Sequence, residues 1–194
     1  MIEKPSVGRA IITKDYNSLN IEIPSKKNWI IIIFLSAWMG GWVMGESFAL
    51  GQIFNFDSPI FANAFIFFWL IGWTVGGAFV LYIILWQLIG REKISIDRGI
   101  IKLERSVKGI GRKKEYDINS ITNIDINPTM DSGIFSNSYN RDLLGMKGGK
   151  IKFDYGMKTI KFARDINEAE AKIIIELLRK NTNFKEENFA VNPN

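Results

Sequence analysis

The side chains that could carry out chemistry in this chain are carboxylates and amines, because the sequence contains no cysteine and no histidine. Without cysteine there is no disulfide, thiolate nucleophile or cysteine-ligated metal. Without histidine there is no imidazole base and no histidine-ligated zinc or haem. No pair of carboxylates or lysines has a spacing typical of acid–base catalysis. We therefore predict a protein that is not an enzyme, with no catalytic residues, no metal site and no cofactor.

One glycine-rich tract, GMKGGK at residues 145–150, has some similarity to a phosphate-binding loop. A Walker loop needs a glycine, four further residues and then Gly-Lys followed by Ser or Thr. Here Ile151 follows Lys150, so the sequence favours a flexible loop over nucleotide binding.

Two long apolar runs are candidate membrane spans, and Glu46, directly after the first run, is the only acidic or basic side chain in either span. A carboxyl group inside a bilayer is costly to bury without a partner, which makes Glu46 a candidate functional site. It lies about 25 Å along a helix that begins at Trp29, where it could reach headgroups or water. The position favours an interfacial or hydrogen-bonded structural role, and a proton or partner site is the alternative.

The elements that would position Glu46 are WIIIIFLSAWMGGWVMG at residues 29–45 and AFIFFWLIGWTVGGAFVLYIILWQLI at residues 64–89. A helix needs about 20 apolar residues to cross a hydrocarbon core of roughly 30 Å. The second run has this length, and the first has it when the next residues are included. We predict a transmembrane helical hairpin over residues 29–90, with helices at about 29–50 and 63–89.

Basic residues lie outside these runs, and the connector at 47–63 carries only one acidic residue and no basic one. The flanking cations are Lys26 and Lys27 before the first run, and Arg91, Lys93 and Arg98 after the second. The positive-inside rule then places both termini in the cytoplasm of a multi-pass protein of the bacterial inner membrane. The formal net charge of +5 is explained by these cations, and no RNA-binding motif accompanies it, so we expect no nucleic acid partner.

Small residues repeat every four positions in both runs, as Gly41 and Gly45 in the first and Gly72 and Gly76 in the second. This spacing lets helix backbones approach closely in lipid. The glycines fall at matching depth, so we expect the two helices to meet there. Alternatively, one of the notches serves a second copy of the chain or a partner helix.

The rest of the chain has the pattern of antiparallel strands closed by one helix. Turns at Asp97–Gly99 and Lys108–Gly111 separate strand-like segments, and GKIKFD and KTIKFA form a further hairpin. We predict a β domain over residues 91–182, with an amphipathic helix at 166–180 whose first turn Asp165 caps. Residues 128–149 are predicted to be a disordered or partner-ordered loop.

The two ends of the chain are predicted to differ. Residues 1–28 contain two strand-like segments, and an isolated hairpin is only marginally stable in water. We therefore expect this N-terminal hairpin to join the β domain that follows the second helix. Residues 183–194 are polar and are predicted to be a disordered tail.

Basic side chains crowd the strands that follow the second apolar run: Lys102, Arg105, Lys108, Arg112, Lys113 and Lys114. Near an anionic leaflet each could contribute about 1 kcal/mol to surface binding. They could equally be solvated cations that protect an edge strand from unwanted pairing. Both interpretations stay open.

Several segments resemble a bacterial family. They are SKKNW, GGWVMGE, WLIGWTVGG, LWQLIGRE, GIGRKKEYDINSITNIDI and FDYGMKTIKFARDINEAEA. Over about residues 20–180 the chain resembles bacterial two-span membrane proteins with a pleckstrin-homology-like cytoplasmic domain. This resemblance implies an α+β membrane protein whose antiparallel β-barrel or sandwich is capped by a C-terminal amphipathic helix. It carries over no catalytic residues.

The function expected from these features is that of a protein-interaction scaffold, assembly factor or regulatory module at the inner membrane. One alternative is a subunit of an oligomeric transporter or channel that uses Glu46. Another is a module that binds the lipid surface. The expected partners are the lipid bilayer with its anionic headgroups, and either another protein or further copies of this chain.

Overall fold

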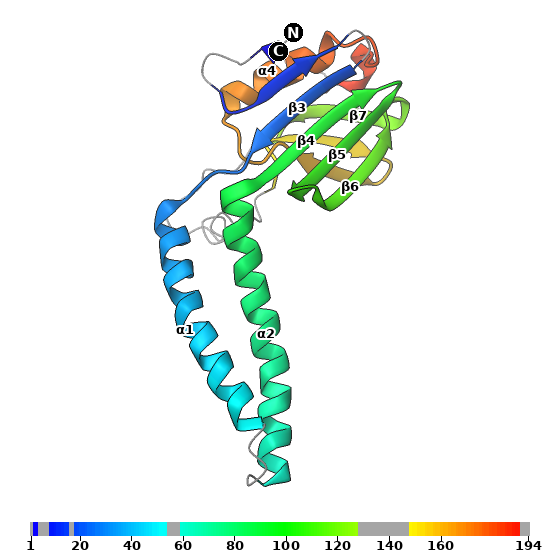
Figure 1. The fold of residues 1–194 in the computed structure, drawn as a ribbon. Helices are drawn as coiled ribbons and strands as arrows, with labels where there is room; N and C mark the ends of the chain where they lie inside the picture. Colours follow the sequence, from blue (N-terminus) through cyan, green and yellow to red (C-terminus); the bar gives the residue numbers. More distant parts are fainter. Residues whose placement is uncertain (1, 4–7, 16–17, 54–58, 128–147, 191–194) are drawn as a thin grey trace. The chain divides into compact units, whose positions relative to one another are not determined.

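The computed structural model describes residues 2–3, 8–15, 18–53, 59–127 and 148–190. The chain divides into a helical unit, residues 27–88, and a sheet unit, which combines residues 1–26 with residues 89–194 (Figure 1). The helical unit is thus inserted in sequence between two parts of the sheet unit.

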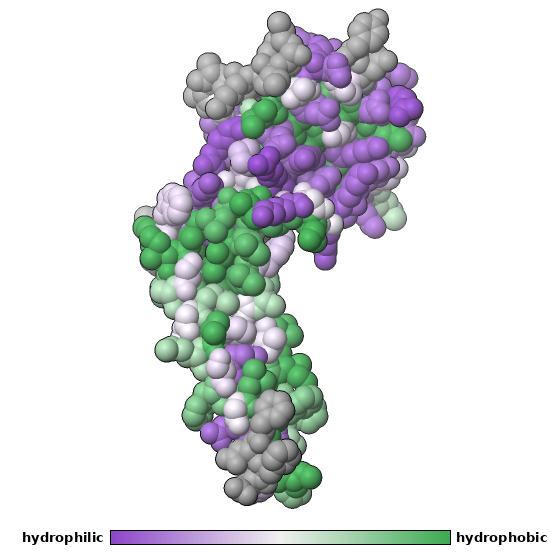
Figure 2. All heavy atoms as spheres, viewed as in Figure 1, coloured by the Kyte–Doolittle hydropathy of each residue, from purple (hydrophilic) through white to green (hydrophobic). Residues whose placement is uncertain are grey.

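The helical unit consists of α1 (Trp29–Ile53) and α2 (Ile60–Ile89), each starting or ending three residues beyond the range expected from the sequence. Both helices are long and apolar enough to cross a membrane. At 1.5 Å per residue they are roughly 37 and 45 Å long. Large apolar side chains point outward, with Ile30 82% and Phe61 87% exposed. Figure 2 shows mostly hydrophobic side chains along these helices, interrupted by a few neutral and hydrophilic ones.

Six strands of the sheet unit form one antiparallel sheet in sequence order. They are β1 (Ile2–Glu3), β2 (Ile11–Lys14), β3 (Ser18–Pro24), β4 (Gly90–Asp97), β5 (Ile100–Val107) and β6 (Ile110–Asp117). The segment considered as an N-terminal hairpin supplies β2 and β3, and β3 pairs with β4 from Ser18–Asp97 to Pro24–Arg91. Alternating residues such as Ile21 and Ile94 are buried on one face.

A second sheet contains β7 (Ile121–Ile126), β8 (Ile151–Tyr155) and β9 (Lys158–Phe162) in the order β7-β8-β9. A 3₁₀ turn, η1 (Ile118–Ser120), separates β6 from β7, and the Asp117 side chain caps it by accepting from the Asn119 N–H at 2.9 Å. Because this turn ends the ladder of the first sheet, β7 begins a new one. Among the described residues no ladder joins the two sheets, so they do not close into the expected barrel.

Both sheets and one helix share a single hydrophobic core. Phe153 and Phe162 of the second sheet are buried, and Tyr116 at the end of β6 packs edge-on against Phe153 with ring centroids 5.3 Å apart. Each large side chain buried in this way contributes about 1.5–3 kcal/mol to stability. The core fixes the positions of the polar groups described below.

The helix of the sheet unit, α4 (Glu168–Arg179), starts later than the sequence suggested, and Asp165 is not its cap. The cap is Asn167, whose side chain accepts from the Glu170 N–H at 2.8 Å while the Glu170 carboxylate accepts from the Asn167 N–H at 3.2 Å. Both Asp165 with Glu168 and Asn167 with Glu170 have capping-box spacing, and burial of Ile166 ahead of the helix selects the second pair.

The prediction of a disordered tail from residue 183 is wrong for residues 183–190. A 3₁₀ turn, η2 (Glu186–Asn188), brings Phe184 and Phe189 into the core, where they are 7% and 4% exposed. The Asn188 side chain donates to the carbonyls of Ile118 and Ile121 at 3.1 and 2.7 Å. Two aromatic side chains and one buried amide thus anchor a segment whose composition is mostly polar. Residues 191–194 lie outside the described part of the chain.

Candidate functional site

The two helices of the helical unit meet where a tryptophan of one faces a glycine of the other. The Trp42 indole N–H donates to the Trp73 carbonyl at 3.2 Å. The Trp42 ring occupies the space that a Cβ on Gly77 would need. Gly45 makes an ordinary contact with the Trp73 ring, at 3.7 Å from the position of a Cβ. The contact between α1 and α2 therefore requires a glycine at Gly77, whereas a methyl group at Gly45 would fit beside the Trp73 ring.

The other glycines of the repeats are open, which corrects the expected contact. A Cβ placed on Gly41, Gly72 or Gly76 would meet nothing within 4 Å. The bulk of Trp42 and Trp73 sets the spacing of the helices, so α1 contacts α2 at Gly77 and not at the expected Gly76. The alternative that the open glycines serve a second helix stays a prediction.

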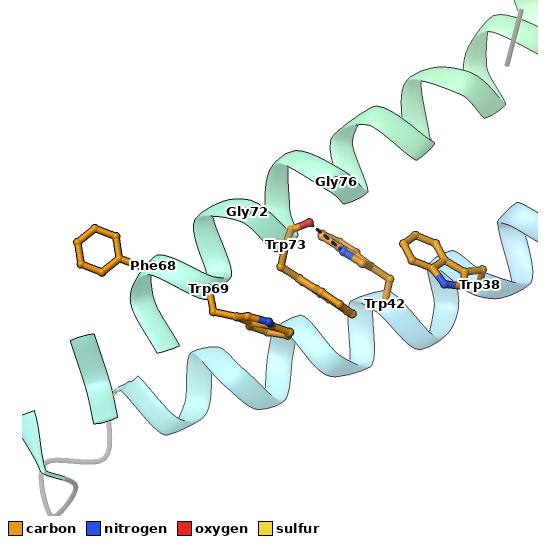
Figure 3. Close-up of a pocket in the computed structure, with 7 residues that line it drawn as sticks. All are labelled: Trp38, Trp42, Phe68, Trp69, Gly72, Trp73 and Gly76. Atoms are coloured by element: carbon orange, nitrogen blue, oxygen red, sulfur yellow. Dashed lines mark hydrogen bonds between the residues drawn. The ribbon is translucent and has the colours of Figure 1, made fainter. Parts of the chain in front are cut away.

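An aromatic groove of about 410 Å³ lies over the open glycines of α2 (Figure 3). Its lining consists of Trp38, Trp42, Phe68, Trp69, Gly72, Trp73 and Gly76. The rings of Trp69 and Trp73 stack at 4.5 Å with an angle of 23° between their planes. Tryptophans of both helices, Trp38 and Trp42 of α1 and Trp69 and Trp73 of α2, therefore form the walls of this groove.

Glu46 has one partner that the sequence analysis did not identify. The Thr74 hydroxyl on α2 donates to Glu46 Oε1 at 2.6 Å. The second carboxylate oxygen, Oε2, is buried and has no hydrogen-bond partner among the described residues. This bond ties α1 to α2 and fits a structural role, while the unpartnered oxygen leaves room for a proton or a further ligand.

The six basic residues expected to form a lipid-facing cluster do not share one face. Residues directly opposite each other in an antiparallel pair point to the same side of the sheet. Lys102 pairs with Glu115, whereas Arg105 pairs with Arg112 and Leu103 with Lys114, on the other side. Lys108 lies in the turn between β5 and β6.

Part of this cluster is also neutralised by Glu115. Lys113 and Lys102 form ion pairs with Glu115 at 3.1 and 3.7 Å. The hydrogen bond from Lys113 and the charge of Lys102 lower the pKa of Glu115 below its usual value. The arrangement fits edge protection of β6 better than one basic surface.

Glu92 is a buried carboxylate in the sheet unit that the sequence analysis overlooked. It is 5% exposed, lies opposite Arg105 on the neighbouring strand, and accepts from the backbone N–H groups of Ala163 and Arg164 at 3.2 and 3.0 Å. Burial raises the pKa of Glu92 above its usual value, although these hydrogen bonds and the nearby arginines oppose that shift. The sequence did contain a sign that Glu92 is buried, because it alternates along β4 with Ile94 and Ile96, which are buried.

Two other candidate sites yield little. Most of the loop at 128–149 lies outside the described residues, but its two ends meet, since the Asn127 N–H donates to the Lys150 carbonyl at 2.8 Å. Across the described segments no three carboxylates converge in a way that could hold a metal ion.

No known family model matches the chain, and no curated protein gives a significant match. The similarity to bacterial two-span membrane proteins with a pleckstrin-homology-like domain consequently stays a prediction.

Proposed function

We propose that this chain is a non-enzymatic integral membrane protein whose helical hairpin anchors the sheet unit at the cytoplasmic face of the bacterial inner membrane. The sheet unit acts there as a protein-interaction scaffold, an assembly factor or a regulatory module. It is a divergent relative of pleckstrin-homology-like domains, and the order of hairpins followed by an amphipathic helix supports this kinship.

The observation that carries the proposal is the point where the chain leaves and re-enters the sheet unit. Pro24 pairs with Arg91 at the end of the β3–β4 ladder, and the Ser25 N–H donates to the Gly90 carbonyl at 3.0 Å. The segments leading to α1 and from α2 are therefore held side by side. Two helices attached to one fold at neighbouring points can cross a bilayer only as a hairpin, with both attachments on one side.

The exposed apolar surface of the two helices supports their placement in a membrane. Phe34, Phe65 and Phe68 are each 67–72% exposed in the chain by itself. Exposed apolar area of this extent is unfavourable in water, by about 25 cal/mol per Å². Hydrocarbon removes that penalty, and the helical backbone satisfies its own hydrogen bonds there.

Single-cysteine labelling tests this topology, because the chain has no cysteine of its own. In spheroplasts a membrane-impermeant maleimide should label Pro59→Cys, between the helices, but should label Lys14→Cys and Lys158→Cys only after permeabilisation. Labelling of Lys14→Cys and Lys158→Cys from opposite compartments would refute the hairpin, as would release of the protein by alkaline carbonate.

A transport role is the second candidate, and the unpartnered Oε2 of Glu46 favours it. A path for ions or protons would require several copies of the hairpin around a shared axis. In that case Glu46→Gln should abolish a flux measured in liposomes, whereas a strictly monomeric protein in native nanodiscs would rule the role out.

A further inference from the structure

We propose that the exposed edge of β6 binds an extended acidic segment of another protein, which adds to the first sheet as a further antiparallel strand. The inference rests on the proposed function and deepens it, because it names the chemistry of the partner that the sheet unit would hold. β6 is the last strand of the first sheet, and no described residue pairs with its outer edge (Figure 1). The unpaired backbone groups of such an edge are a template for another strand.

The edge formed by β6 is long, regular and open. β6 pairs with β5 from Ile100–Asp117 to Val107–Ile110 without a shift of register. Residues 110–115 are all exposed, and the side chain of Ile110 is 84% exposed. No described residue therefore covers either face of the strand over most of its length.

Rows of directly opposed residues on the core-facing side of the sheet define what a further strand would have to offer. Such residues have neighbouring side chains on one face. One row consists of Glu92 on β4, Arg105 on β5 and Arg112 on β6. Glu92 compensates the charge of Arg105, whereas Arg112 lies at the open end of the row beside a like charge. A carboxylate opposite Arg112 would complete the row.

Lys114 provides a second charged position on the same face, because it is two residues from Arg112 along the strand. It is exposed and lies opposite Leu103. Among the described residues neither Arg112 nor Lys114 forms an ion pair, whereas Lys113 on the other face is paired with Glu115 at 3.1 Å. The added strand should therefore carry two acidic residues that are two positions apart.

Apolar rows flank the two charged positions. Tyr116 lies opposite Ile101, and Ile110 lies opposite Val107. Apolar side chains on the added strand would extend both of these rows. Since that strand runs antiparallel to β6, we expect the pattern apolar–x–acid–x–acid–x–apolar, in which each x points to the other face of the sheet.

The cations of β6 also explain why this edge does not pair indiscriminately. Lysine and arginine on an edge strand oppose the addition of a neutral or basic strand, because their charges would lose water without gaining a counterion. An acidic strand supplies that counterion. Edge protection and selective binding are thus two consequences of one arrangement of charge.

The test measures binding of the fluorescently labelled peptide Val-Thr-Glu-Thr-Glu-Thr-Val to the full chain in mild detergent by fluorescence anisotropy. The peptide should bind, and an analogue with lysine in place of both glutamates should not. Arg112→Gln/Lys114→Gln should bind the glutamate peptide roughly tenfold more weakly. Arg112→Glu/Lys114→Glu should lose the glutamate peptide and bind the lysine peptide instead, whereas Arg112→Lys/Lys114→Arg should behave as the original chain does.

A matched control removes two cations elsewhere in the sheet unit. Lys152 and Lys161 lie opposite each other on β8 and β9. Lys152→Gln/Lys161→Gln changes the net charge by the same amount and should leave binding of the glutamate peptide unchanged. Equal loss in this control, or no loss in Arg112→Gln/Lys114→Gln, would overturn the proposal.

Methylation of the peptide backbone separates strand addition from charge attraction alone. Backbone groups of neighbouring residues point to opposite sides of a strand. N-methylation of the central threonine or of the glutamate after it should therefore abolish binding in one peptide and spare it in the other. Equal binding of both would refute strand addition.

A second copy of the chain is the other occupant that the experiment can identify. A dimer that the original chain forms in native mass spectrometry and that Arg112→Glu/Lys114→Glu does not form would assign the edge to self-association and overturn the proposal. Cysteine labelling of Lys14→Cys and Lys158→Cys tests the membrane topology independently. Failure of the proposed function is thus distinguished from failure of the β6 edge to bind a peptide.

Discussion

At the scale of single residues, the sheet unit tolerates two buried carboxylates by surrounding each with backbone donors. Glu92 accepts from Ala163 and Arg164, and Glu170 accepts from Arg9, Ala10 and Asn167. A buried carboxylate without such partners would be strongly destabilising. Each one therefore ties together segments far apart in sequence, and Glu92 joins β4 to the segment after β9.

The raised pKa of Glu92 predicts a specific pH dependence of stability. Folded protein binds the Glu92 proton more tightly than unfolded protein, whose value is near 4.5. The free energy of unfolding therefore decreases as pH rises from about that value through the raised pKa, because the buried group must ionise. Glu92→Gln should make this decrease shallower in urea unfolding of the full chain in micelles, followed by circular dichroism.

Asp154→Asn provides a control of opposite sign. Hydrogen bonds from Thr159 and Asn123 lower the pKa of Asp154, so its contribution is lost as pH falls through that lowered value. The variant should alter only the acidic end of the stability curve. An identical pH profile for Glu92→Gln and the original chain would contradict the role assigned to burial.

The hydrogen bond between Thr74 and Glu46 gives a second prediction at this scale. Thr74→Val keeps the shape of the side chain but removes the donor to Glu46 Oε1. Loss of one such hydrogen bond costs about 0.5–1.5 kcal/mol, so the hairpin should separate at a lower SDS concentration. The six tryptophans all lie in the helical unit, and their fluorescence reports this transition. Thr74→Ser keeps the donor and should behave as the original chain, and equal effects of Val and Ser would argue against the bond.

At the scale of elements, α1 and α2 pack through tryptophans set against glycines. Repeats of small residues every four positions indicate where a helix can be approached closely, but they do not identify the side chain that packs there. Here Trp42 packs against Gly77, and nothing packs against Gly72 and Gly76 within 4 Å of a Cβ placed there. The repeat was therefore a correct sign of close approach and an incorrect guide to register.

Two adjacent glycines of α2 make a matched pair of variants. Gly77→Ala places a methyl group into the Trp42 ring and should destabilise the hairpin by roughly 1–3 kcal/mol, as overpacking does. Gly76→Ala adds the same methyl group where nothing lies within 4 Å, and should leave the hairpin unchanged in the SDS titration. Equal destabilisation by both would mean that Gly76 also faces a helix, as a second copy would supply.

The C-terminal segment gives a prediction about the sheet unit. Phe189 is 4% exposed and pairs with Phe184 at a ring distance of 6.0 Å. Phe189→Ala should reduce the free energy of unfolding by about 3–5 kcal/mol in urea. Met157→Ala, at a fully exposed turn, should change it by less than about 0.5 kcal/mol. A small effect of Phe189→Ala would show that the segment contributes little to the core.

At the scale of the whole molecule, periodicity was enough to predict two long apolar helices, antiparallel hairpins and one amphipathic helix. It was not enough to predict closure of the sheets, since the turn at Ile118–Ser120 decides whether β7 extends the first ladder or begins a second. The buried polar groups were missed for a related reason. Glu92, Glu170 and Asn188 each have hydrogen-bond partners 67–161 residues away, and no local pattern encodes such distances.

The loop at 128–149 allows the proposed scaffold function to be tested separately from folding. Ile126 pairs with Ile151, and the Asn127 side chain donates to the Gly149 carbonyl at 3.0 Å, so the ends of the loop are already joined. Replacing residues 129–148 with a short Gly-Ser linker should therefore preserve the sheet unit, and a shorter loop lowers the entropic cost of closure only slightly. Urea unfolding should be unchanged.

If this loop binds a partner, crosslinking in native membranes followed by mass spectrometry should find defined proteins with the original chain but not with the shortened variant. A surface control, Lys158→Gln/Lys161→Gln, should still capture them. Unchanged capture in a variant that unfolds normally would move the interaction elsewhere, to the β6 edge or to the aromatic groove. Loss of both capture and stability would instead mean that the loop supports the β7–β8 ladder. One measurement reports on binding and the other on folding. Together they decide whether a partner docks on the loop or on the sheet unit itself.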